Sequence, residues 1–320
     1  MLGARLRYAG LHPRALAAWA GTDRLSALPA LLPALLERDL TPASTLLALF
    51  VAGREVPLDR LRLAVDLDAL NRLDLIDIAG TSARARSAVL PIGQALLACD
   101  RLDTAPSPDL VCWPDDSSYH LALALPPGRK QRWLDLGSGS AFAPLMRPEL
   151  TTEIAATDVN ARAVELARHG AELSSVAHLT SYVSDLADEV PADWRGTCSI
   201  VSCNAPIPER DDDPYRPRWR STDLGFIERL FAQAASCVAP NGIVVVHGAH
   251  DALAPVIADL PGERTVVVYT PPGARGFAVA WWVPGAEPRH VEAKRTLTEA
   301  RPHLTHDDRI AALAGTLPAA

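Results

Sequence analysis

The sequence has few cysteines, and their arrangement argues against disulfide-stapled and zinc-bound domains. Only five occur in 320 residues, and an odd number in so long a chain makes a disulfide framework an unfavourable interpretation. No Cys-x-x-Cys pair is present, and no cluster of cysteine and histidine has zinc-ligand spacing. We therefore expect no metal site, and we take a reducing cytoplasm as the compartment.

Long apolar runs and surplus positive charge are also missing. No uninterrupted apolar stretch reaches the ~18 residues that a membrane helix needs. Arg5, Arg7 and Arg14 interrupt the apolar positions near the first residue, which does not fit a signal peptide. The net charge of -7 disfavours nucleic acid, whose binders usually carry a basic surface. We expect a small-molecule or peptide partner and no membrane. The oligomeric state stays open, with a homodimer among the arrangements allowed.

The composition is that of a folded enzyme-sized chain. It is 48% hydrophobic and 22% charged, which is globular rather than disordered, and it is long enough for a large core and a smaller domain. We expect a mainly helical N-terminal domain over residues 1–105, a linker and lid over 106–129, and an α/β domain over 130–320.

The N-terminal part predicts helices followed by a hairpin. Residues 3–39 are rich in Ala and Leu and are punctuated by prolines, which indicates two or three helices. Further helices are expected at 41–52, 56–65 and 67–73, and strands at 75–79 and 85–92. Three helices and a hairpin is the order of a winged-helix module, which often binds nucleic acid. Because the second half of this segment has little basic charge, a helical cap or a dimerisation domain is the favoured interpretation.

From residue 130 onward, strand and helix patterns alternate, which predicts a mostly parallel sheet covered on both faces. The seven expected strands are 132–136, 153–157, 179–183, 198–203, 243–247, 264–269 and 276–283. Helices are expected at 160–173 and 222–238, with one or two more within 287–314. The charged loop 209–220 contains Arg216, Arg218 and Arg220, which we interpret as surface charge.

The stretch 133–141, Trp-Leu-Asp-Leu-Gly-Ser-Gly-Ser-Ala, is the strongest local signal. A short apolar strand runs into Gly137 and Gly139, and a helix can begin after them. Strand, glycine turn and helix N-terminus form a cradle for a nucleotide-like ligand. A dinucleotide fingerprint would have a third glycine where Phe142 stands, so NAD and FAD are disfavoured.

Three acids fall at the ends of successive predicted strands. Asp158 follows the glycine turn by about 20 residues, the place of an acid that accepts hydrogen bonds from ribose hydroxyls. Asp185 ends the next strand, where its carboxylate or the neighbouring backbone would meet an adenine amino group. Together with Asp135 they mark the sheet edge at which open α/β folds bind ligands.

Over roughly residues 130–283, this pattern resembles the class I S-adenosylmethionine (SAM)-dependent methyltransferases. The motifs that carry the resemblance are 135–141, 157–160, 184–186 and 202–207. The resemblance implies a Rossmann-like, seven-stranded methyltransferase sheet and SAM as co-substrate. By it, Asp135, Gly137, Ser138 and Gly139 lie near the methionine end of SAM, Asp158 holds the ribose, and Asp185 and Leu186 frame the adenine. Val159, next to Asp158, is also expected among the cofactor-binding residues. Ala141 stands where the family usually has another glycine.

Asn204-Ala-Pro-Ile207 resembles the Asn-Pro-Pro-Tyr signature of methyltransferases that act on nucleobase or glutamine nitrogens. In that branch the asparagine oxygen and the next carbonyl hold the acceptor amino group in line with the methyl. The resemblance implies that Asn204 and Pro206 orient the acceptor, with Asn204 also beside SAM. Ile207 replaces the aromatic residue, which weakens the case for a nucleobase because stacking contributes ~1–3 kcal/mol per base. The order of the whole chain, with the predicted helices and hairpin before the α/β domain, also resembles a known arrangement. In that arrangement a small winged-helix-like domain precedes an Asn-Pro-Pro methyltransferase.

Other polar and aromatic residues are candidates for the site. Tyr119 and Trp113 lie in a segment before the glycine turn that would cross the mouth of the site, and Tyr119 is the candidate third catalytic residue. Packing in the core is the alternative for both. His247 and His250 flank a strand and are too isolated to bind metal.

Three functional hypotheses follow. The first is a SAM-dependent methyltransferase that modifies a small molecule or peptide, with nitrogen favoured as the acceptor atom. The second keeps the fold and cyclises SAM itself, as azetidine-2-carboxylate synthases do, releasing methylthioadenosine. The third is a non-catalytic SAM-binding or DNA-binding regulator.

Overall fold

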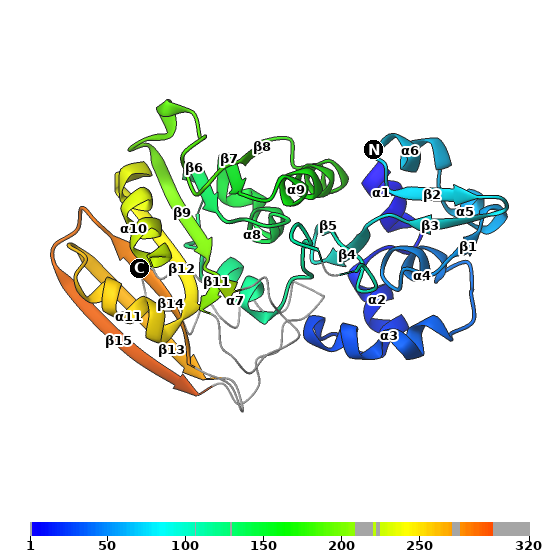
Figure 1. Cartoon of the computed structure of the whole chain (residues 1–320), viewed down its shortest axis with the longest axis horizontal. Coiled ribbons are helices and arrows are strands. Elements are labelled where there is room, and N and C mark those ends of the chain that lie inside the picture. Colours follow the sequence, from blue (N-terminus) through cyan, green and yellow to red (C-terminus); the bar gives the residue numbers. More distant parts are fainter. Residues whose placement is uncertain are drawn as a thin grey trace.

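The centre of the structure is an eight-stranded sheet with the strand order β15-β13-β14-β12-β9-β6-β7-β8 (Figure 1). This computed structural model describes residues 2–105, 107–128, 130–208, 220–221, 225–270 and 276–296. The strands are β6 (Lys130–Leu136), β7 (Thr151–Asp158), β8 (Leu179–Val183), β9 (Cys198–Asn204), β12 (Val238–Ala249), β13 (Glu263–Thr270), β14 (Phe277–Val283) and β15 (Arg289–Thr296).

All seven strands predicted from the sequence lie in this sheet, but the predicted count is wrong by one. β15 occupies part of the 287–314 segment for which a helix was expected, and it pairs in parallel with β13 from Glu263↔Arg289 to Thr270↔Thr296. Its sequence is rich in charged and polar residues, which suits an edge strand as well as an exposed helix. Residues 297–314 lie outside the described part of the chain.

Strand direction explains where a ligand can bind. β12, β9, β6, β7 and β8 are parallel neighbours, whereas β14 runs antiparallel to both β12 and β13. The carboxyl ends of β6, β7, β9 and β12 therefore meet at one edge of the sheet, which is the edge where open α/β folds bind ligands.

Alternate residues of the central strands separate into two hydrophobic cores. Trp133, Ile154 and Ile200 belong to one buried cluster, and their neighbours Leu134 and Val201 belong to the other. The first cluster contains side chains of α7 (Asp116–Ala124), α8 (Phe142–Met146) and α9 (Ala161–Ser174). The second contains side chains of α10 (Phe226–Cys237) and α11 (His250–Ala258). The sheet is thus covered on both faces, as the alternation of elements predicted.

The N-terminal helices and the small sheet lie at the end of the molecule opposite β13 and β15 (Figure 1). The helices are α1 (Leu2–Tyr8), α2 (Pro13–Ala20), α3 (Leu28–Leu36), α4 (Thr45–Phe50), α5 (Leu58–Ala64) and α6 (Leu67–Arg72). β1 (Val56–Pro57), β3 (Ser82–Ala85) and β2 (Ile76–Ala79) form a small sheet in that order.

The remaining elements of the chain are short. 3₁₀ helices lie at Leu25–Ala27, Pro148–Leu150 and Ala192–Trp194, and β10 (Ile207–Pro208) pairs with β11 (Arg220–Ser221).

A second hairpin, which was not predicted from the sequence, joins the N-terminal part to the large sheet domain. β4 (Ala88–Ile92) and β5 (Ala95–Cys99) are buried at every position. β5 lies against α9, where the Leu96 backbone N–H donates to Ser174 Oγ at 2.9 Å. The strand predicted at 85–92 is in fact the end of β3 followed by β4.

Candidate functional site

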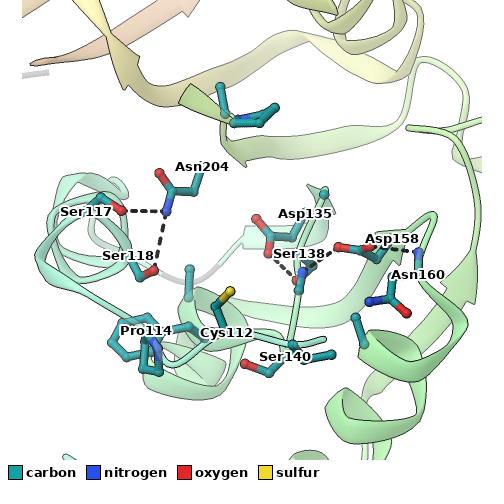
Figure 2. A pocket seen from close by; sticks show the side chains of 18 of the residues that line it. Cys112, Pro114, Ser117, Ser118, Asp135, Ser138, Ser140, Asp158, Asn160 and Asn204 are labelled. Carbon is teal, nitrogen blue, oxygen red and sulfur yellow. Dashed lines mark hydrogen bonds between the residues drawn. The ribbon is translucent and has the colours of Figure 1, made fainter. Parts of the chain in front are cut away.

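A cavity of about 490 Å³ opens at the carboxyl edge of the parallel strands. Its wall is formed by the ends of β6, β7, β9 and β12, by α7, and by residues between Pro108 and Asp115. Figure 2 shows Asp135, Ser138 and Asp158 side by side, with Asn204 nearby and directed at α7. The predicted residues that line the cavity are Asp135, Gly137, Ser138, Gly139, Asp158, Val159, Asp185, Leu186, Asn204 and Pro206.

The glycine turn has the backbone conformation that the sequence suggested. Gly137 and Gly139 have φ values of 59° and 56°, and Ala141 follows at 60°. The Ser138 N–H donates to the Thr157 carbonyl at 2.7 Å, which ties the turn to β7. Left-handed backbone is unfavourable for a residue with a Cβ, so Ala141 is strained where the methyltransferase family usually has glycine.

Asp135 is a buried carboxyl at the end of β6, only 3% exposed. It accepts hydrogen bonds from the hydroxyls of Ser138 and Ser202. Burial raises the pKa of Asp135 to about 6; the two hydroxyls oppose that shift, and the charge of Asp158 adds to it. Burial makes the ionised form of this carboxyl unfavourable, and a cationic ligand would offset that cost by pairing with the negative charge.

Asp158 is held by the turn itself. Its carboxylate accepts from the Gly139 N–H at 2.8 Å and from the Asn160 N–H at 2.9 Å (Figure 2). Burial raises the pKa of Asp158 despite these two backbone donors. Val159, next to it, is 67% exposed. The carboxylate therefore lies at a fixed place on the cavity wall.

The Asp185 carboxylate, which was predicted to meet the adenine amino group, is already paired with an arginine. Its Oδ2 forms an ion pair with Arg229 Nη1 at 2.9 Å, so one oxygen is already engaged. Leu186 is 4% exposed and has left-handed backbone with φ 51°. Ser184 and Leu186, whose backbone was the other predicted adenine contact, also line the cavity.

Asn204, at the end of β9, faces the N-terminal turn of α7. Its Nδ2 donates to Ser117 Oγ at 2.9 Å and to Ser118 Oγ at 3.3 Å (Figure 2). Its Oδ1 lies 2.8 Å from His247 Nδ1, because β12 pairs with β9 in the register His247↔Asn204. Burial and the nearby His120 lower the pKa of His247 to about 3, so this imidazole is neutral.

Tyr119 does not line the cavity. It is 2% exposed and belongs to the core between α7 and the sheet, so its predicted catalytic role has no geometric support. The reason is helical periodicity: Ser117 and Ser118 face the cavity, and Tyr119 turns away from it. These two serines were not predicted from the sequence, because they look like ordinary residues of a helix start. His247 was left without a role, although it ends a predicted strand.

The segment before α7 lies over the cavity. Val111, Cys112 and Trp113 line it. The Val111 N–H donates to the buried Asp100 carboxylate at 2.7 Å, and Arg162 Nε of α9 donates to the same group at 2.9 Å. The region predicted as a lid is therefore fastened to α9.

Two further observations concern metal sites and membrane-spanning helices. Within the described residues, no group of His, Cys, Asp and Glu side chains is arranged to hold a metal ion. In the same part of the chain, no helix combines the length and the apolar character needed to cross a membrane. The loop residues Arg216 and Arg218 lie outside the described residues, and the Arg220 side chain is likewise not described.

The family model of the methyltransferase small domain matches residues 113–271, which is just under half of the chain and includes most of the cavity wall. No curated protein matches the sequence. Solved structures are similar to it at low identity. A predicted O-methyltransferase from Agrobacterium tumefaciens is 19% identical with a TM-score of 0.42, over 56% of this chain and 85% of that one.

Two streptococcal structures are similar to the same degree. An rRNA methylase from Streptococcus thermophilus is 13% identical with a TM-score of 0.40, over 52% of this chain and 93% of that one. A Streptococcus mutans protein in complex with S-adenosylhomocysteine (SAH) is 14% identical with a TM-score of 0.39, over 52% and 94%.

Proposed function

We propose that this chain, which is a SAM-dependent methyltransferase, transfers the methyl group to a nitrogen atom of a small molecule or peptide. The domain match at residues 113–271 supports the reaction class. The orientation of the Asn204 amide is the observation that supports the acceptor. Both of its Nδ2 contacts go to the α7 serines, so the amide offers the cavity a hydrogen-bond acceptor and not a donor.

The charges around the cavity suit SAM as co-substrate. The titratable side chains among its described lining residues are Cys112, His247 and four aspartates, and no lysine or arginine is among them. SAM carries a sulfonium and an ammonium group and supplies an electrophilic methyl. Asp135, with its raised pKa, would receive the ammonium of the methionine end beside the glycine turn. Asp158 would hold the ribose hydroxyls.

Nitrogen is favoured because the acceptor side offers orientation rather than a base. His247 is neutral, and both of its ring nitrogens are engaged in hydrogen bonds. A hydroxyl or carbon acceptor needs a base to remove its proton as the methyl is transferred. An amino nitrogen has its own lone pair, and Asn204 Oδ1 can accept one of its N–H hydrogens. Holding that nitrogen in line with the methyl supplies most of the rate.

A small or peptide acceptor is favoured over nucleic acid by charge. Phosphate recognition depends on lysine and arginine, and the described cavity wall contains neither. We further propose that the domains divide as predicted, at 1–105, 106–129 and 130–320, that the N-terminal domain supports α9 rather than binding DNA, and that the enzyme works in the cytoplasm.

The proposal is tested by product analysis. Purified protein is incubated with SAM alone, and then with small amines and amides, short peptides or RNA oligonucleotides, and the nucleoside product is identified by mass spectrometry. We expect SAH only when an amine, amide or peptide is present. Asn204→Ala should lower the rate about 100-fold or more with SAH binding retained, whereas Asp158→Ala should abolish SAH binding. Methylthioadenosine from SAM alone would instead establish cyclisation. Methylation of RNA only would overturn the proposed acceptor class.

A further inference from the structure

A line of hydrogen bonds runs behind Asn204 through His247, Tyr269 and His120, none of which the proposed function places against the acceptor. His247 Nδ1 lies 2.8 Å from Asn204 Oδ1, and its Nε2 lies 2.5 Å from the Tyr269 hydroxyl. The same hydroxyl lies 2.8 Å from His120 Nδ1. His247 is 1% exposed and Tyr269 6% exposed. The contact between His247 and Tyr269 is therefore shielded from water, whereas His120 is only partly buried. Each polar atom of the line depends on its neighbours.

The direction of each hydrogen bond follows from the Asp115 carboxylate, which lies beyond Ser117 at one end of the line. The Asp115 carboxylate caps α7 and can only accept hydrogen bonds when ionised. The Ser117 hydroxyl donates to it, so the remaining lone pairs of Ser117 Oγ must accept from Asn204. The group of Asn204 that faces Ser117 is therefore Nδ2, and Oδ1 faces His247.

The same donor and acceptor rules set the proton positions on the other side of Asn204. Because Oδ1 can only accept, His247 Nδ1 must carry the hydrogen. The ring is neutral because burial lowers the pKa of His247 to about 3, so Nε2 has a lone pair and accepts from the Tyr269 hydroxyl. The Tyr269 oxygen then accepts from His120 Nδ1. All the bonds point the same way, from His120 to Asp115.

We infer that Tyr269 and His247 are positioning residues that hold the Asn204 amide with its oxygen available to the acceptor, a role that rests on the proposed function. The tautomer of His247 is set by both contacts together: Asn204 Oδ1 requires hydrogen on Nδ1, and the bond that Tyr269 donates keeps hydrogen off Nε2. Without it, the Nε2–H tautomer would become populated. A nitrogen lone pair would then face Asn204 Oδ1, and the amide would lose its fixed orientation.

The tautomer is measured by two-bond nitrogen–proton NMR on the full chain labelled with ¹⁵N-histidine at pH 7. The His247 signal is assigned by its loss in His247→Asn. In the unmodified protein we expect neutral His247 with hydrogen on Nδ1, and in Tyr269→Phe a substantial population with hydrogen on Nε2. Tyr182→Phe removes a phenol hydroxyl from β8, away from the cavity wall, and should change nothing. An Nε2–H tautomer or a charged ring in the unmodified protein would overturn the inference. An unchanged tautomer in Tyr269→Phe would overturn it as well.

A kinetic comparison with the acceptor found by product analysis tests the consequence for the reaction. Tyr269→Phe should lower kcat about tenfold, the equivalent of one lost hydrogen bond, with the KM for SAM and the affinity for SAH unchanged. His247→Asn places an amide nitrogen where Nδ1 was, so it should retain more activity than His247→Leu. Equal losses in these two variants, or an unchanged kcat in Tyr269→Phe, would contradict a positioning role. The NMR arm needs no acceptor, so a failed product assay and a failed hydrogen-bond direction are distinguishable.

Discussion

Asp135 opposes folding in its ionised form, and two hydroxyls offset part of that cost. Its pKa is raised to about 6, so the folded state prefers the protonated form more than the unfolded state does. The resulting stability is fully present below the ordinary pKa of an aspartate and is lost as pH rises through about 6. Because a tenfold difference in proton affinity between the folded and unfolded states corresponds to about 1.4 kcal/mol, the ionised carboxyl costs up to roughly 3 kcal/mol at pH 8.

Asp135→Asn should therefore stabilise the free protein at pH 8 and weaken cofactor binding. We expect the free energy of unfolding to rise by about 1–3 kcal/mol, because the Ser138 and Ser202 hydroxyls can rotate to accept from an amide. The gain should shrink as pH falls from 7 to 5. Urea denaturation at several pH values and SAH titration measure both effects. Asp188→Asn, at an exposed carboxylate that bonds Gln233, is the control and should show no such trend. A destabilised Asp135→Asn at pH 8 would contradict the interpretation.

At the scale of elements, one buried carboxylate fastens the segment over the cavity. Asp100 is 2% exposed, and it accepts from the Val111 N–H and from the Arg162 guanidinium. Trp113 Nε1 donates to the Asp100 carbonyl at 2.7 Å. Asn160 Nδ2 also holds the segment, through the Asp109 carbonyl at 2.8 Å. These bonds join the cavity cover to the start of α9.

Arg162→Met should loosen this cover by leaving the Asp100 carboxylate without its cation. Removing one partner of a buried pair costs about 3–5 kcal/mol, and the partly exposed Arg162 places this case near the lower value. Hydrogen exchange at the Val111 amide should quicken, and SAH binding should weaken. Adding Asp100→Asn to Arg162→Met removes the unpaired charge and should restore most of the stability. Unchanged exchange at Val111 in the single variant would show that Arg162 does not hold the segment.

The whole molecule depends on close contact between the N-terminal part and α9. A Cβ at Gly170 would lie 2.7 Å from Leu145 Cδ1 and 3.5 Å from the Leu96 carbonyl. A Cβ at Gly3 of α1 would lie 1.7 Å from the Leu173 carbonyl. α9 therefore supports the cavity on one side and carries the N-terminal part on the other.

Gly170→Leu should force α9 away from α8 and β5. Overpacking typically costs about 1–3 kcal/mol, and we expect at least the upper value because both α8 and β5 close on this position. Glu165→Leu places the same side chain on the exposed face of α9 and should change the free energy of unfolding by about 0.5 kcal/mol or less. Urea denaturation of both variants measures the difference. Equal stabilities would show that α9 does not need this close approach to α8 and β5.

The parts of the fold that could be predicted from the sequence depend on local patterns. Apolar runs ending at Asp135 and Asp158 mark strands, and Gly137 with Gly139 marks the turn, because periodicity and backbone freedom act over a few residues. β15 and the β4–β5 hairpin were missed for the complementary reason. Strand pairing with β13 and packing against α9 stabilise them, and neither contact has a local signature.

The sequence alone determined the proposed cofactor side: the glycine turn, Asp135 and Asp158 each follow from the end of one strand, and topology brings parallel strand ends together. Only the tertiary structure decided the contacts of Asn204 on the proposed acceptor side. Asn204 meets Ser117 across 87 positions and His247 across 43, and Tyr269 meets His120 across 149. Such contacts depend on sheet register and helix packing, which fix hydrogen-bond geometry between residues that no sequence spacing relates.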